Sequence, residues 1–163
     1  MVKMKWVITD DLSNVSLTEF DYEWNGMIAG FFQLVVNGRK EGIYSERLIT
    51  SGTMGLDEIV HWLSELYNGL NKVKMGEKYE VILLTMNVYK FCLELNEKLE
   101  ISFVNKQTGE AKWKESVELQ EFEDELYENI EKFLLYLKEI NPQLLKSKWI
   151  KEMIPDNFEF CQI

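Results

Sequence analysis

The sequence is poor in the residues that build disulfides, metal sites and linkers. Its two cysteines, Cys92 and Cys161, lie far apart and form no CxxC pair, so nothing supports a disulfide framework or a zinc site. With a single histidine, His61, a transition-metal site would need carboxylates alone. The two prolines, Pro142 and Pro155, mark no Pro-rich linker. We therefore expect no metal and no cofactor.

Long apolar runs are also missing. No window approaches the roughly 18 consecutive apolar residues of a membrane helix, and the N-terminal segment reaches Asp10 and Asp11 before a signal-peptide core forms. These absences argue against a membrane span and a secretory signal, and they predict a cytoplasmic protein. The net charge is −10 without a basic stripe, which argues against nucleic-acid binding, because that binding rests on lysine and arginine.

Material for a core is plentiful, since 46% of the 163 residues are hydrophobic and 13% are aromatic. At this length we expect one domain, residues 1–163. Strands in antiparallel runs with segregated helices predict an α+β fold, in which an antiparallel meander sheet is packed on one face by two or three helices. Residues 9–26 receive no assignment, and Asn37-Gly38 predicts a hairpin turn. The predicted strands are Lys3–Ile8, Met27–Val36, Arg39–Ser45, Lys78–Met86, Val88–Leu95, Leu99–Val104 and Glu110–Val117.

Three helices are predicted from apolar periodicity. The first runs from Leu56 to Lys72 and the longest from Leu119 to Ile140. The last follows Asn141-Pro142, with Asn141 as N-cap and Pro142 in the first turn, and it ends before Pro155.

Catalytic residues are not evident. His61 has the side chain of a general base, but no serine or cysteine nucleophile lies at a recognisable motif spacing from it. A histidine packed on the flank of a helix is the simpler interpretation. The segment Ser51–Gly55 precedes a helix, yet it lacks the spacing and the lysine of a phosphate loop. Asp57 and Glu58 would also repel a phosphate there. We therefore expect a protein that is not an enzyme.

The feature that stands out is a run of acids on the longest helix. Residues 115–131 contain eight acids and no base, although like charges four residues apart disfavour a helix by about 0.2–0.5 kcal/mol per pair. A solvated face would explain the run, but a basic partner would relieve the repulsion. Trp62 appears off its helix's apolar stripe and is a candidate anchor, although core packing explains it equally well. The predicted partner-binding residues are Glu118, Glu121, Asp124, Glu125, Glu128, Glu131 and Trp62.

The layout of the chain resembles the small immunity proteins that accompany bacterial polymorphic toxins. The resemblance lies in the FFQLVVNG hairpin, the LDEIVHWLSELYNGL helix, the YEVILLTMNVYKFCLEL strand region and the acidic helix before Asn141-Pro142. It implies a bacterial protein that inhibits a cognate toxin by tight binding, often a basic nuclease domain. These families share no catalytic residues, so the resemblance assigns no role to any single residue.

Two alternatives stay open. One is a small-molecule or enzymatic pocket on the concave side of the sheet, with His61 and buried carboxylates as its polar groups. The other is a homodimer or larger homo-oligomer that uses Trp149 and the segment Phe158–Ile163 as contacts.

Overall fold

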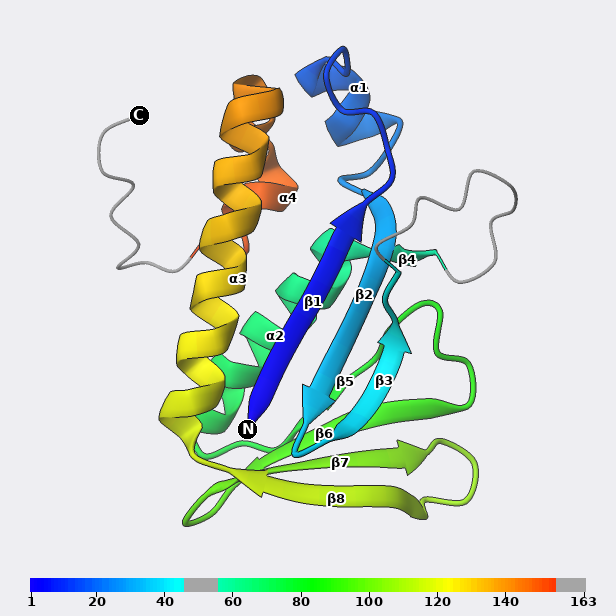
Figure 1. The fold of residues 1–163 in the computed structure, drawn as a ribbon, viewed down its shortest axis with the longest axis vertical. Coiled ribbons are helices and arrows are strands. Elements are labelled where there is room, and N and C mark those ends of the chain that lie inside the picture. The colour runs from blue at the N-terminus through cyan, green and yellow to red at the C-terminus, as the bar shows by residue number, and fades with distance from the viewer. Residues whose placement is uncertain (46–55, 155–163) are drawn as a thin grey trace.

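The computed structural model describes residues 1–45 and 56–154 and has an α+β fold (Figure 1). The described residues contain eight strands, which form two antiparallel four-stranded sheets. The predicted fold class is therefore confirmed, although the strands are divided between two sheets instead of forming one meander. The predicted loop Ser51–Gly55, the tail Phe158–Ile163 and Cys161 lie outside the described residues.

In the first sheet, β2 (Ala29–Val36) lies between β1 (Val2–Ile8) on one side and both β3 (Arg39–Ile43) and β4 (Asp57–Glu58) on the other. Most of β2 is buried on both faces, as its continuous apolar run predicts. The hairpin turn at Asn37-Gly38 is present, with φ values of 49° and 87°, which are the left-handed values that a type I′ turn requires. β1 therefore forms one edge of this sheet.

The second sheet has the order β5-β6-β7-β8. Of the predicted strand Lys78–Met86, only three residues pair with a neighbour, because the chain leaves the sheet after Val81. The following segment is held by helix α2 (Ile59–Lys74) instead: Ile82 O lies 2.9 Å from Nε2 of His61. The strands are β5 (Tyr79–Val81), β6 (Tyr89–Leu95), β7 (Leu99–Asn105) and β8 (Ala111–Val117).

Two long helices cover the sheets, and α3 runs beside β1 (Figure 1). α3 spans the predicted range, and α2 begins and ends within three residues of its prediction. No helix in residues 1–45 and 56–154 has both the length and the apolar character needed to cross a bilayer. The helices are α1 (Leu17–Tyr22), α2 (Ile59–Lys74), α3 (Leu119–Ile140), α4 (Lys148–Lys151) and a 3-10 turn at Pro142–Lys146.

Asn141 and Pro142 occupy the predicted N-cap and first-turn positions, but the Asn141 side chain has another role. This side chain makes no capping hydrogen bond to the turn that follows. Instead its buried Nδ2 donates to the carbonyl oxygens of Leu12 and Val15, at 2.7 and 2.8 Å. The residue therefore fastens the N-terminal loop, which carried no prediction, to the end of α3.

Most of the buried apolar side chains form one continuous cluster between the two sheets and the helices. Trp62 lies within this cluster, with no exposed surface, and stacks on Phe32 of β2 at a ring-centroid distance of 4.5 Å. It also packs against Phe91 of β6. The prediction that Trp62 anchors a partner is therefore wrong, because the second sheet covers the flank of α2 that the helical pattern left open.

Candidate functional site

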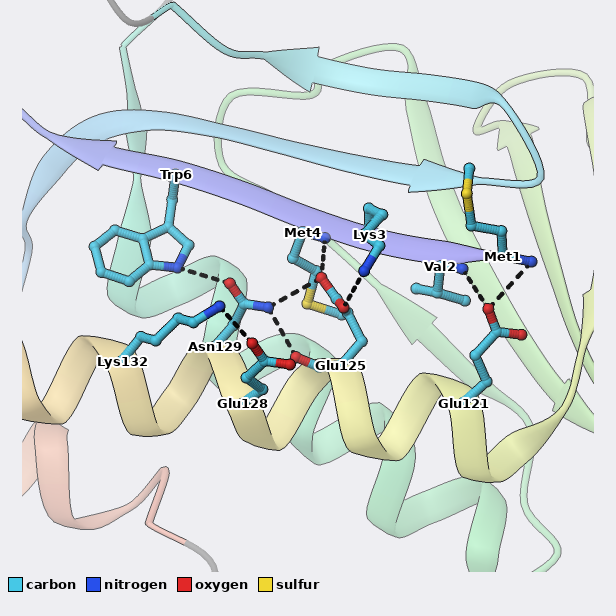
Figure 2. A network of polar contacts seen from close by, with 10 residues as sticks. All are labelled: Met1, Val2, Lys3, Met4, Trp6, Glu121, Glu125, Glu128, Asn129 and Lys132. Atoms are coloured by element: carbon cyan, nitrogen blue, oxygen red, sulfur yellow. Dashed lines mark hydrogen bonds and ion pairs between the residues drawn. The ribbon is translucent and has the colours of Figure 1, made fainter.

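Two carboxylates of the acidic helix bind the edge of the first sheet (Figure 2). Glu121 Oε1 accepts a hydrogen bond from the backbone N–H of Val2 at 2.9 Å, and Glu125 Oε1 accepts one from Met4 at 2.7 Å. Alternate residues of an edge strand direct their N–H groups to the same side, and residues four apart share one face of a helix. Glu121 and Glu125 therefore take the place of a neighbouring strand.

A third contact continues this row. Asn129, one turn beyond Glu125, accepts a hydrogen bond from the indole N–H of Trp6 at 3.1 Å (Figure 2). Its own Nδ2 donates to the backbone oxygen of Glu125 at 2.8 Å, which fixes the amide orientation. We call Glu121, Glu125 and Asn129 the edge ladder. The hydrogen bond from Val2 and the nearby N-terminal ammonium lower the pKa of Glu121 below its usual value.

The positive charge missing from the acidic segment comes from other elements of the chain. Glu121 lies 3.2 Å from the N-terminal ammonium, and Glu125 lies 3.5 Å from Nζ of Lys3. Most of the self-repulsion that the sequence suggests is therefore offset inside the molecule. The remaining ion pairs of this segment are Glu115–Arg39, Glu118–Lys98, Glu123–Lys74 and Glu128–Lys132.

The outer face of α3 keeps only part of the predicted acidic surface. Asp124 is exposed and accepts a hydrogen bond from Gln120, whereas Glu128 is exposed and pairs with Lys132. Glu131 is exposed and has no ion pair with any residue in the described ranges. Of the six acids predicted to bind a partner, Glu121 and Glu125 thus serve the fold, and the other four remain available at the surface.

The histidine and the described cysteine, which could take part in catalysis, have environments that favour a structural role. His61 uses Nε2 for the contact with the carbonyl of Ile82. Cys92 and Ser102 lie on the outer face of the second sheet, in a small hollow of about 110 Å³. Burial raises the pKa of the Cys92 thiol, which keeps it protonated and a weak nucleophile. None of these arrangements places a general base beside a nucleophile.

A larger hollow lies where the sequence allowed no assignment. It has a volume of about 400 Å³, and it is formed by the end of the loop after β1, the turn after α1, the start of β2 and β4. Asn25-Gly26 turns the chain through left-handed φ values of 52° and 71° and brings Trp24 to the wall. We call it the Trp24 hollow, and its lining residues are Asp10, Glu23, Trp24, Met27, Ala29, Asp57 and Glu58.

Three of the four carboxylates in this Trp24 hollow are held by hydrogen bonds. Asp10 accepts from the backbone N–H of Ala29 at 2.7 Å, and Asp57 accepts from the Thr85 hydroxyl at 2.8 Å. Glu58 accepts from the backbone N–H groups of Ile28 and His61. Burial raises the pKa of Glu58 above its usual value.

The carboxylates of the Trp24 hollow have no basic neighbour in its described lining. Among the described residues, no lysine or arginine lines it. Between residues 10 and 65 the described part of the chain has nine acids, and within residues 1–45 and 56–154 only Glu41 of these forms an ion pair. Acids without an ion pair to a described residue thus occur in this part of the chain as well as on the outer face of α3. An Asn-Gly turn directly after Trp24 was the one signal in the sequence that pointed to this site.

Comparison of the chain with protein-family models, with curated proteins and with solved structures found no match. Within the described residues, no group of three or more histidine, cysteine or acidic side chains is arranged to hold a metal ion.

Proposed function

We propose that this chain is a non-enzymatic binding protein of the immunity type, which neutralises a basic protein domain. The observation that supports the proposal is the set of acids between residues 10 and 65, of which only Glu41 has an ion-pair partner in the described ranges. Charge of one sign on one region of a surface steers a partner of opposite charge and favours its binding. Asp124 and Glu131 on the outer face of α3 are exposed and add to the negative charge of the protein.

The test is capture of a partner from a lysate of the cells that carry the gene, with the protein immobilised and the column eluted by increasing salt. We expect a basic protein to be retained at low salt and released by 1 M salt, because the screening length falls from about 10 Å at 0.1 M to about 3 Å at 1 M. Retention only of proteins that resist 1 M salt, or no retention, would contradict the proposal.

Charge-reversal variants must avoid the edge ladder, since Glu121 and Glu125 stabilise the fold. Asp124→Lys with Glu131→Lys alters the outer face of α3, and Glu23→Lys alters the Trp24 hollow. Glu110→Lys, in the exposed turn between β7 and β8, is the matched control for a single charge reversal. The variant that loses the partner identifies the surface in use.

A small-molecule site is the second candidate, favoured by the size of the Trp24 hollow. Its volume of about 400 Å³ falls within the range of about 300–1,000 Å³ that ligand pockets occupy. A screen of cationic metabolites by thermal shift tests it, and a saturable stabilisation that Glu23→Gln abolishes would favour it over the protein partner.

A further inference from the structure

We propose that the Trp24 hollow is the point where the basic partner inserts an arginine side chain. This inference rests on the proposed function, since it specifies which surface the partner uses and with which group. The hollow combines an aromatic side chain, apolar lining residues and carboxylates that form no ion pair with a described residue, and each of these matches a different part of the arginine side chain.

The apolar lining suits the stem and the planar face of arginine. Trp24 is half-buried, with its ring packed on Phe20, so its position is fixed before any partner arrives. Met27 has 48% of its surface exposed beside it. A guanidinium stacks on an indole face, is weakly hydrated and leaves its apolar stem in contact with neighbouring methylenes, whereas an ammonium is a compact and strongly hydrated charge.

The carboxylates retain acceptor capacity for the guanidinium. Asp10 uses Oδ2 for Ala29, and Asp57 uses Oδ1 for Glu58 and Thr85, so each has a second oxygen without a described donor. Glu23 is exposed and makes no side-chain hydrogen bond to a described residue. A guanidinium offers five N–H donors in a rigid fork, which several carboxylate oxygens around one hollow can accept together.

Exposed apolar residues in the connection between β5 and β6 offer contact area that a protein partner could use and a small cation could not. The Thr85–Asp57 hydrogen bond ties the connection between β5 and β6 to the edge of the hollow. In the same connection, Leu84 has 62% of its surface exposed and Ile82 has 50% exposed. Exposed apolar residues beside a charged hollow are typical of a protein interface, in which an anchor is surrounded by contacts that exclude water.

The test uses a capped tetra-arginine peptide as the probe and records the protein by two-dimensional NMR. The Trp24 indole signal is identified with Trp24→Phe, and the Met27 methyl signal with Met27→Leu. We expect both signals to shift in a saturable manner. Capped tetra-lysine should bind about 2- to 5-fold more weakly, because an ammonium is more strongly hydrated and has no plane to stack on the indole. The neutral isostere, tetra-citrulline, should not bind.

Two variants distinguish binding in the Trp24 hollow from a general attraction between the peptide and the negatively charged protein. Glu23→Gln removes one charge from the hollow without removing a hydrogen bond to a described residue, and we expect about 3-fold weaker binding of tetra-arginine. Glu110→Gln removes the same charge from the exposed turn between β7 and β8, and we expect unchanged affinity.

Each result decides between the two proposals. Saturable shifts at Trp24 and Met27 that weaken in Glu23→Gln support the inference. Shifts confined to the outer face of α3 around Glu128, or equal binding of tetra-lysine, would overturn it. If a basic partner is captured and Glu23→Lys leaves that capture unchanged, the proposed function stands and the arginine inference fails. If no basic partner is captured, the proposed function fails as well.

Discussion

Removing one carboxylate of the edge ladder should destabilise the protein far more than removing its exposed neighbour. Glu125→Ala deletes the acceptor of the Met4 N–H and the partner of Lys3. Glu128→Ala, one turn away on the same helix, deletes only an ion pair with Lys132. The Glu125 side chain is 11% exposed and the Glu128 side chain is 58% exposed, so solvent can replace only the second interaction.

The magnitudes follow from these contacts. A hydrogen bond to a charged group contributes about 1.5–3 kcal/mol, and the exposed Lys3 pair adds at most about 1 kcal/mol. We therefore expect Glu125→Ala to lower the free energy of unfolding by about 2–3 kcal/mol and Glu128→Ala by about 0.3–0.5 kcal/mol. For a chain of this size, about 1 kcal/mol corresponds to a Tm change of roughly 2–4 °C. The difference in helix propensity cancels, because both changes replace glutamate by alanine within α3.

Urea unfolding followed by circular dichroism measures both values, and native-state hydrogen exchange reports on the Met4 amide directly. That amide should exchange faster in Glu125→Ala and at the wild-type rate in Glu128→Ala. Glu125→Gln, which keeps a neutral acceptor, should fall between wild type and Glu125→Ala. Equal destabilisation by Glu125→Ala and Glu128→Ala would refute the edge ladder as a source of stability.

Three further predictions concern other contacts. The pKa of Glu121 is lowered in the folded state, so the unfolded chain binds more protons in acid. The stabilisation from Glu121 is therefore present above the ordinary pKa of 4.5 and is lost as the pH falls below it. Urea midpoints at several pH values should show that Glu121→Gln loses less stability in acid than the wild type. Asn141→Ala removes the short hydrogen bonds to the carbonyl oxygens of Leu12 and Val15, which keep only 3.4 Å contacts with Val15 N and Gln143 Nε2, and should cost about 1–3 kcal/mol in chemical unfolding. Asn141→Asp should cost more, because its carboxylate would face both oxygens. Gly26→Ala should lower the free energy of unfolding by about 1–3 kcal/mol more than Gly38→Ala in the same assay. Both glycines have positive φ, but only a Cβ at Gly26 would clash with Cγ of Trp149. Similar losses for the two variants would contradict this packing.

Elements with strong local periodicity could be predicted from the sequence. The bounds of α3 and the hairpin at Asn37-Gly38 follow from patterns within a few residues. α1 was missed because it is only six residues long and has one buried side chain, Phe20, which leaves no apolar period to detect. The split into two sheets could not be predicted either, because strand order depends on pairing between distant segments.

The candidate site could be predicted only in part, for the same physical reason. The acids of α3 are visible in the sequence, but the N–H groups that two of them bind lie about 120 residues earlier, as the pairs Val2–Glu121 and Met4–Glu125 show. The Trp24 hollow brings residues between 10 and 29 together with β4, and the sequence pattern does not predict that these segments meet. Its charge balance depends on which lysines are used elsewhere, and that distribution is a property of the folded surface.

The edge ladder also has a maximum length that follows from helix and strand geometry. Four helical residues advance about 6.0 Å, whereas two strand residues advance about 6.7 Å. With each successive contact, the helix residue therefore falls about 0.7 Å further behind the strand residue that it faces. After a few contacts, the helix side chains no longer reach the backbone N–H groups of the strand. Here Glu121 and Glu125 reach backbone N–H groups, and Asn129 meets the longer side chain of Trp6 instead. A straight helix can thus cap only a short strand edge, and longer edges need a curved helix or another strand.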